Sequence, residues 1–142
     1  MDLVPKLSRI YPVGRLDANS EGLLIMTNDG EFANLLTHPR HAYEKEYHVA
    51  MPGTTREEDL RTLRSGVEIE GGRTAPAVVR VLSSNGKITW LSITVREGRN
   101  RQIRGMLDAL GYRADRLVRA RVGPQWLGSL SRGSYRQLTP AE

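Results

Sequence analysis

The sequence predicts an α+β fold in which a mixed, largely antiparallel sheet is flanked by a few helices. Segments with strand-like patterns outnumber the segments that have helical periodicity. The two kinds do not alternate regularly, as they would in a fold built from repeated strand–helix–strand units. No repeat or low-complexity linker divides the 142 residues, so the chain is expected to form a single domain.

The first predicted elements are a strand and a helix that meet at Asn28. Residues 23–27 form an apolar run, which is short enough for a buried strand. Asn28 and Glu31 have the spacing of a capping box, so a helix is expected to begin there. Apolar residues follow at helical spacing, and Pro39 marks the end of this helix.

A strand and a second helix are expected in the middle of the chain. Side chains alternate over residues 44–51, which predicts a strand with two different faces. One face is expected to carry Tyr43, Lys45, Tyr47 and Val49, and the other Glu44, Glu46 and His48. Thr55 and Glu58 form a second capping box, and Gly66 is expected to end that helix in a left-handed conformation.

The remaining elements are mostly strands. Residues 67–70 and 76–82 are predicted strands on either side of a glycine turn, and an Asn-Gly hairpin signal leads into residues 88–95. A helix is expected over residues 100–110, because its apolar residues form one stripe. Strands are also predicted where apolar residues alternate with arginines and near the end of the chain, at residues 118–122 and 135–138.

Composition excludes several classes of site. The chain has no cysteine, which rules out disulfides and thiolate metal sites. Its histidines lack a ligand-like spacing with carboxylates, so no metal site is expected. No apolar run approaches the roughly 20 residues that span a bilayer, and the first residues do not resemble a signal peptide. We therefore expect a soluble, cytoplasmic protein without a membrane partner.

The net charge of +5 and the sequence pI near 10.0 suit a polyanionic partner. Eight arginines lie between positions 96 and 121, whereas the first half of the chain has no excess of basic over acidic residues. This concentration favours a binding face for nucleic acid, and an ordinary solvated basic surface is the alternative.

Residues 14–24, GRLDANSEGLL, place Asp17 in a polar, turn-forming stretch directly before an apolar run. On physical grounds Asp17 either caps a turn or is a carboxylate held at the rim of a sheet. The segment resembles the catalytic loop of the ribosomal pseudouridine synthases, specifically small-subunit synthase A and large-subunit synthases B, E and F. This resemblance implies that Asp17 is the catalytic nucleophile. Arg15 and Asn19 are candidates for substrate binding in the same loop.

The second segment is EKEY, at residues 44–47. An aromatic ring between charged residues on a strand can stack on a nucleobase, and packing against the neighbouring strand is the alternative. The segment resembles the K-x-Y element of the same synthases. The resemblance implies that Tyr47 packs on the target base and is a candidate proton acceptor.

The third segment, EGRNRQIR at residues 97–104, follows a predicted strand and opens a predicted helix. N–H groups at a helix start and nearby guanidinium groups favour phosphate oxygens, with solvated arginines as the alternative. The segment resembles the third element of the family, which implies that Arg104 pairs with Asp17 and that Ile103 lines the pocket. Gly105 departs from the pattern, because an arginine is usual there. Further candidates for substrate binding are Arg99, Asn100 and Arg101.

The resemblance implies isomerisation of a uridine to pseudouridine in ribosomal RNA, without a metal, redox or nucleotide cofactor. It leaves open whether Asp17 attacks the base or the sugar. The alternative is a catalytically inactive RNA-binding module that keeps the fold. Residues 1–142 are expected to be a portion of the catalytic domain, without an amino-terminal RNA-binding domain or the first catalytic strand, and to act as a monomer.

Overall fold

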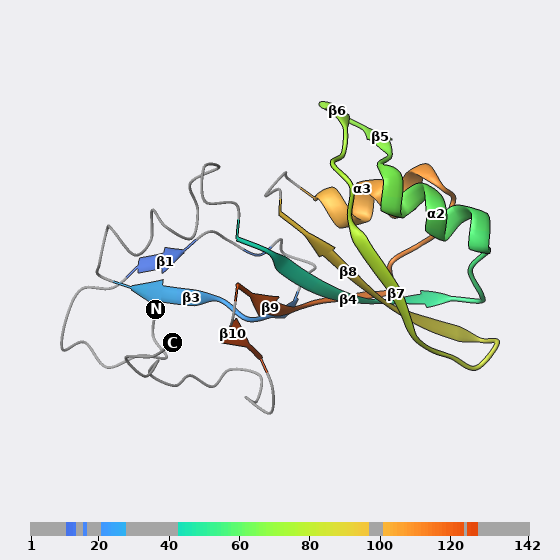
Figure 1. The fold of residues 1–142 in the computed structure, drawn as a ribbon. Helices are drawn as coiled ribbons and strands as arrows, with labels where there is room; N and C mark the ends of the chain where they lie inside the picture. The colour runs from blue at the N-terminus through green and yellow to red at the C-terminus, as the bar shows by residue number, and fades with distance from the viewer. Residues whose placement is uncertain are drawn as a thin grey trace.

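The computed structural model describes residues 11–13, 16, 21–27, 43–96, 101–123 and 125–127. Its main sheet has the strand order β10-β9-β4-β8-β7, with β2 attached to β9 off this path (Figure 1). The strand bounds are β2 Glu21–Gly22, β4 Lys45–Pro52, β7 Val78–Ser84, β8 Ile88–Val95, β9 Arg116–Val122 and β10 Gln125–Trp126.

Pairing in this sheet is antiparallel everywhere except at β2. Strand β4 pairs with β8 on one side and with β9 on the other, and β7 and β10 extend the two edges. Strand β2 runs parallel to β9. The sheet is therefore mixed and largely antiparallel, and together with the helices of the described residues it confirms the α+β class.

Two helices cover one part of the sheet, α2 (Glu57–Ser65) and α3 (Gln102–Ala109), and Figure 1 shows them side by side over the strands. Each helix turns an apolar stripe toward the strands, as the sequence predicts. The core that results contains Val49 of β4, Leu91 and Ile93 of β8, Leu60 and Leu63 of α2, and Ile103, Met106 and Leu107 of α3. No helix in the described ranges is long and apolar enough to cross a membrane.

The start of α2 differs from the prediction. The N-cap residue is Arg56 rather than Thr55, and no side chain of the cap makes a capping hydrogen bond. The hydroxyl of Tyr112 takes the place of a capping side chain. It accepts a hydrogen bond from the Arg56 amide at 3.2 Å and donates one to the Asp59 carboxylate. A residue 56 positions away thus satisfies a helix terminus that the local pattern assigns to Thr55.

The end of α2 differs as well. Gly66 has φ 118° and ψ 147°, so its conformation is not the left-handed helical one that was expected. A Cβ atom at this position would lie 2.5 Å from the carbonyl oxygen of Thr74. Close approach of another backbone segment, in addition to the positive φ, is the reason for glycine here.

The strand predicted over residues 23–27 begins later than expected, at Ile25. Strand β2 ends at Gly22, and the chain resumes extended structure in β3 (Ile25–Thr27), which pairs with β1 (Tyr11–Val13) in a separate sheet. A second small sheet pairs β5 (Glu68–Ile69) with β6 (Gly72–Arg73). The helix predicted from Asn28 and the strand predicted at residues 135–138 lie outside the described residues.

Candidate active site

The sequence-predicted site residues fall into two groups. Tyr47, Arg101, Ile103 and Arg104 lie within the described part of the chain. The residues outside it are Arg15, Asp17, Asn19, Arg99 and Asn100, so their expected roles remain predictions. The described residues define the scaffold on which the first two motif segments meet.

The chain after the Asp17 loop is fixed to β9 through Arg119. The Leu23 amide donates to the Arg119 carbonyl at 2.8 Å, and the Nε atom of Arg119 donates to the Leu23 carbonyl at 2.8 Å. Glu21 adds an ion pair to Arg116, with N···O distances of 2.9 and 3.0 Å. These contacts anchor the carboxyl-terminal end of the first motif on a central strand.

Gly22 permits this attachment. It has φ 116°, and a Cβ atom there would lie 2.2 Å from the Arg119 carbonyl oxygen and 2.5 Å from the Arg119 nitrogen. No side chain fits in that space, because both neighbouring atoms belong to the backbone of β9. Glycine at position 22 is therefore required by the parallel pairing of β2 with β9.

Tyr47 lies beside Arg119 as well, on the strand that pairs with β9 from the other side. In the β4–β9 register Tyr47 is paired directly with Arg119, so their side chains share a face of the sheet. Tyr47 is half-buried and packs against the core, whereas Arg119 is only 4% exposed. Arg119 thus connects the end of the first motif with the second motif, across two strand pairings.

The sequence pattern did not identify Arg119 as a site residue. Regular alternation would place Arg119 and Arg121 on one face of β9. A register shift between Glu46 and Tyr47 places them on opposite faces instead, so that Arg121 is paired with Glu46 and Arg119 with Tyr47. No spacing signal in the sequence marks this bulge.

The third motif forms the start of α3. Arg101 is the N-cap residue and, in the described part of the chain, the sole non-glycine residue with positive φ, at 51°. Ile103 is 3% exposed and belongs to the core. The half-buried Arg104 donates from a terminal amino group to the Ala114 carbonyl at 3.1 Å. At Gly105 a Cβ atom would meet Ile69 at ordinary contact distance, 3.6 Å, so backbone geometry does not explain this glycine.

Positive charge gathers on the face of β4 that carries Tyr47. Lys45 precedes Tyr47 by two residues and therefore shares this face. Burial lowers the pKa of the Lys45 ammonium, and the nearby positive charge of Arg119 lowers it further. An aromatic ring and two cations thus lie together where the first and second motifs meet, an arrangement suited to a base and its phosphate.

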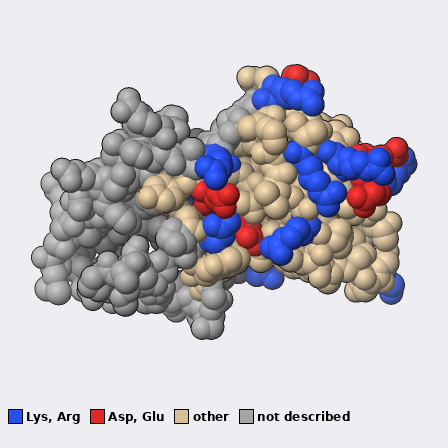
Figure 2. All heavy atoms as spheres, in the orientation of Figure 1, with Lys and Arg blue, Asp and Glu red and all other residues tan. Residues whose placement is uncertain are grey.

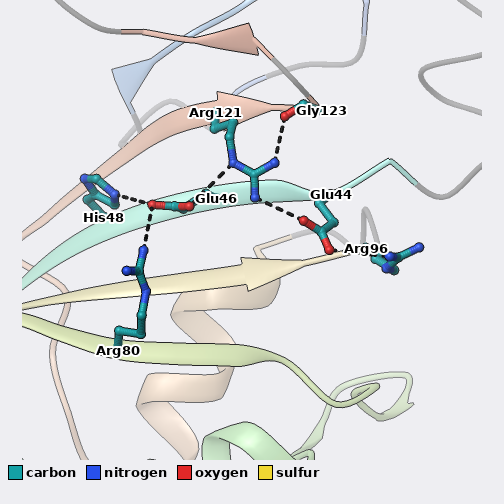
Figure 3. Close-up of polar contacts among 7 residues, drawn as sticks. All are labelled: Glu44, Glu46, His48, Arg80, Arg96, Arg121 and Gly123. Atoms are coloured by element: carbon teal, nitrogen blue, oxygen red, sulfur yellow. Dashed lines mark hydrogen bonds and ion pairs between the residues drawn. The ribbon is translucent and has the colours of Figure 1, made fainter.

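The opposite face of β4 carries a network of ion pairs, drawn in Figure 3. The Glu46 carboxylate, 4% exposed, lies 2.7 Å from the ring of His48, 3.5 Å from Arg121 and 3.8 Å from Arg80. Glu44 joins Arg121 to Arg96 at 3.1 and 3.4 Å. Both carboxylates on this face are thus paired with positive side chains, whereas the cations of the Tyr47 face have no carboxylate partner within the described residues.

The arginine-rich segment is accordingly less positive than its composition indicates. In the described part of the chain, Arg96 and Arg121 pair with Glu44, Arg113 pairs with Asp115, and Arg116 pairs with Glu21. Figure 2 shows basic and acidic atoms interspersed on the viewed face. Within the described ranges no group of three or more histidine, aspartate or glutamate side chains could hold a metal ion.

Comparison with known proteins gives a consistent result. The sequence model of the family described as RNA pseudouridylate synthase matches residues 2–109. The chain is 44% identical over 136 residues to the ribosomal large subunit pseudouridine synthase B of Bacillus subtilis, covering 94% of this chain and 56% of that protein. It is 40% identical over 151 residues to the ribosomal large subunit pseudouridine synthase E of Vibrio parahaemolyticus, covering 96% and 63%.

A solved structure described as a pseudouridylate synthase superposes with a TM-score of 0.85 at 32% identity, covering 93% of this chain and 57% of that one. The chain thus spans somewhat more than half the length of these proteins. Sequence and fold agree over nearly all of the chain. The protein belongs to the RNA pseudouridylate synthase family.

Proposed function

We propose that the protein isomerises a uridine to pseudouridine in ribosomal RNA, with Asp17 as the nucleophile. The names of its relatives support ribosomal RNA as the substrate class. The observation that carries the proposal is the pair of contacts around Arg119, which holds the end of the Asp17 loop on one side and faces Tyr47 on the other. The end of the first motif segment and the second motif segment thus lie on β2 and β4, the two strands that pair with β9 from opposite sides.

The proposed reaction breaks one bond and forms another within the same nucleotide. The glycosidic bond between the ribose and a ring nitrogen of uracil breaks, the ring turns, and a ring carbon bonds to the ribose. The proton of that carbon is released, and the freed nitrogen gains one, so no electrons are exchanged with a carrier. The target base must first leave its stack, which costs a few kcal/mol. Stacking on Tyr47 would offset part of that cost.

The chemistry assigns a role to each candidate. Asp17 must be ionised to act as a nucleophile, and a cation beside it, for which Arg104 is the candidate, would favour the ionised form. Tyr47 supplies the stacking face. Further contacts with the substrate are assigned to Arg15, Asn19, Arg99, Asn100 and Arg101, and Ile103 supports them from the core.

The direct test is release of tritium from ribosomal RNA labelled at carbon 5 of its uridines. We expect the chain to release tritium into water in proportion to the pseudouridine formed. The rival assignment, a non-catalytic RNA-binding module, predicts RNA binding without release. Binding measured in parallel separates the two, and release no greater than in a protein-free control, with binding intact, would favour the rival.

A further inference from the structure

Two positive side chains on the Tyr47 face have no carboxylate partner in the described part of the chain. Lys45 lies on this face two residues before Tyr47, and Arg119 is paired with Tyr47 across β9. Nε of Arg119 donates to the Leu23 carbonyl, which leaves the two terminal amino groups of the guanidinium for another acceptor. The neighbouring carboxylates, Glu44 and Glu46, lie on the opposite face, where arginines hold them.

This arrangement is unfavourable without an anion. Two like charges close together, one half-buried and one almost fully buried, repel each other and lose hydration. The other clustered arginines at 96, 113, 116 and 121 all have carboxylate partners. Within the described residues, Lys45 and Arg119 thus lie near each other without a carboxylate partner, and an entering anion would relieve their repulsion.

We propose that Lys45, reinforced by the buried Arg119, binds a backbone phosphate of the nucleotide whose base stacks on Tyr47. The proposal rests on the assignment of Tyr47 as the stacking residue. Side chains two residues apart on one strand face are roughly 7 Å apart, which suits a base and the phosphate of its own nucleotide. The phosphate oxygens accept hydrogen bonds from both cationic groups. Lys45 thereby fixes the register of the RNA strand relative to Tyr47.

The test measures RNA affinity as a function of salt for Lys45→Gln, with Lys87→Gln as the matched control. Lys87 lies in the exposed β7–β8 hairpin, so the control removes one surface lysine elsewhere. Loss of one phosphate contact should reduce the slope of log affinity against log salt by about 0.7 for a single strand or 0.9 for a duplex. We expect this reduction, with about tenfold weaker binding, for Lys45→Gln only.

Two further arms make the result specific. Lys45→Arg keeps the charge and should restore most of the slope, which a purely structural role would not require. An RNA with one uncharged methylphosphonate linkage beside the target uridine should bind the parent protein about tenfold more weakly, and this loss should be clearly smaller for Lys45→Gln, which keeps the contact from Arg119 alone.

Equal salt slopes for Lys45→Gln and Lys87→Gln would overturn the proposal. So would a fall in kcat for Lys45→Gln without any change in slope, because the cations would then serve a carboxylate of the protein. Binding does not depend on turnover, which separates this proposal from the proposed function. A selective slope change in a chain that releases no tritium would support the phosphate site and contradict the catalytic assignment.

Discussion

Gly22 shows most clearly how one residue of the first motif serves the structure. The sequence marks it as a glycine beside a polar loop, which allows several explanations. The structure gives one explanation, because β2 lies so close to β9 that a Cβ atom would overlap the Arg119 backbone. Position and chain direction after the Asp17 loop therefore depend on this glycine.

Gly22→Ala should destabilise the fold by roughly 3 kcal/mol, from backbone strain and from overlap with β9. Gly72 provides a control with the same strain alone, since its φ is 114° and nothing lies within 4 Å of a Cβ atom there. Gly72→Ala should cost about 1 kcal/mol. The free energies of unfolding in urea compare the two variants, and equal costs would contradict the close-approach explanation.

The position of Arg119 opposite Tyr47 could not be predicted from the local sequence. Its neighbours alternate between apolar and basic, and that pattern indicates a strand, which the structure confirms as β9. The bulge that turns Arg119 toward Tyr47 depends on pairing with a segment some 70 residues away. Such pairing is a tertiary property, so the sequence predicts Tyr47 as a site residue but does not predict that Arg119 lies opposite it.

At the scale of elements, β4 has two electrostatically different faces. The Tyr47 face carries cations without described carboxylate partners, whereas Glu46 on the other face is surrounded by His48, Arg80 and Arg121. Burial alone raises the pKa of Glu46, but the hydrogen bond from His48 and the positive charges of His48 and Arg121 outweigh it, so the net pKa is lowered. Ionised Glu46 therefore stabilises the sheet.

Glu46→Gln should destabilise the protein by about 2 kcal/mol at pH 7, the usual worth of a hydrogen bond to a charged group. A carboxyl group with a lowered pKa contributes stability above its ordinary value of 4.5 and loses that contribution as the pH falls through the lower folded value. The difference between parent and variant should thus shrink near pH 3. Free energies of unfolding in urea at pH 7 and near pH 3 measure this difference.

Glu58→Gln is the control, because the Glu58 pair with Arg56 is exposed on both sides and should contribute little to stability at either pH. A Glu46→Gln cost that is the same at both pH values would show that packing, and not charge, explains the effect.

Helix α2 gives a second prediction at this scale. The Tyr112 hydroxyl accepts from the Arg56 amide and donates to Asp59, so it ties the segment after α3 to the first turn of α2. Tyr112→Phe should cost about 1–2 kcal/mol in the free energy of unfolding. Tyr43→Phe, at a more exposed ring, should change stability by less than about 0.5 kcal/mol. Equal losses of stability in Tyr112→Phe and Tyr43→Phe would contradict the capping role of the Tyr112 hydroxyl.

Local pattern predicted the elements better than their ends. Strand β4 follows from alternation, β8 from the hairpin signal before it, and the buried stripe of α3 from helical spacing, and the structure confirms all three. The predicted starts of the first strand, at Leu23, and of α2, at Thr55, were wrong, because contacts with the distant residues Arg119 and Tyr112 determine these boundaries. Hydrogen bonds across the fold thus set boundaries that capping patterns alone do not determine.

At the scale of the whole molecule, net charge is a weaker guide to RNA binding than local pairing. The arginines at 96, 113, 116 and 121, which the sequence groups into one basic face, pair with the acidic residues at 21, 44, 46 and 115. The cations around Lys45 and Arg119, beside Tyr47, lack such carboxylates in the described part of the chain. This local difference is the reason for proposing that the substrate binds on this side of the sheet.

The measurement that tests the central claim most directly compares tritium release by the parent chain and by Asp17→Asn on ribosomal RNA labelled at carbon 5 of uridine. Asparagine keeps the shape of the side chain and removes its charge and nucleophilicity. We expect release to fall to background in Asp17→Asn, while RNA affinity and melting temperature stay close to those of the parent. Release by Asp17→Asn within about tenfold of the parent rate, a loss of under roughly 1.4 kcal/mol in transition-state stabilisation, would contradict the assignment of Asp17 as the nucleophile.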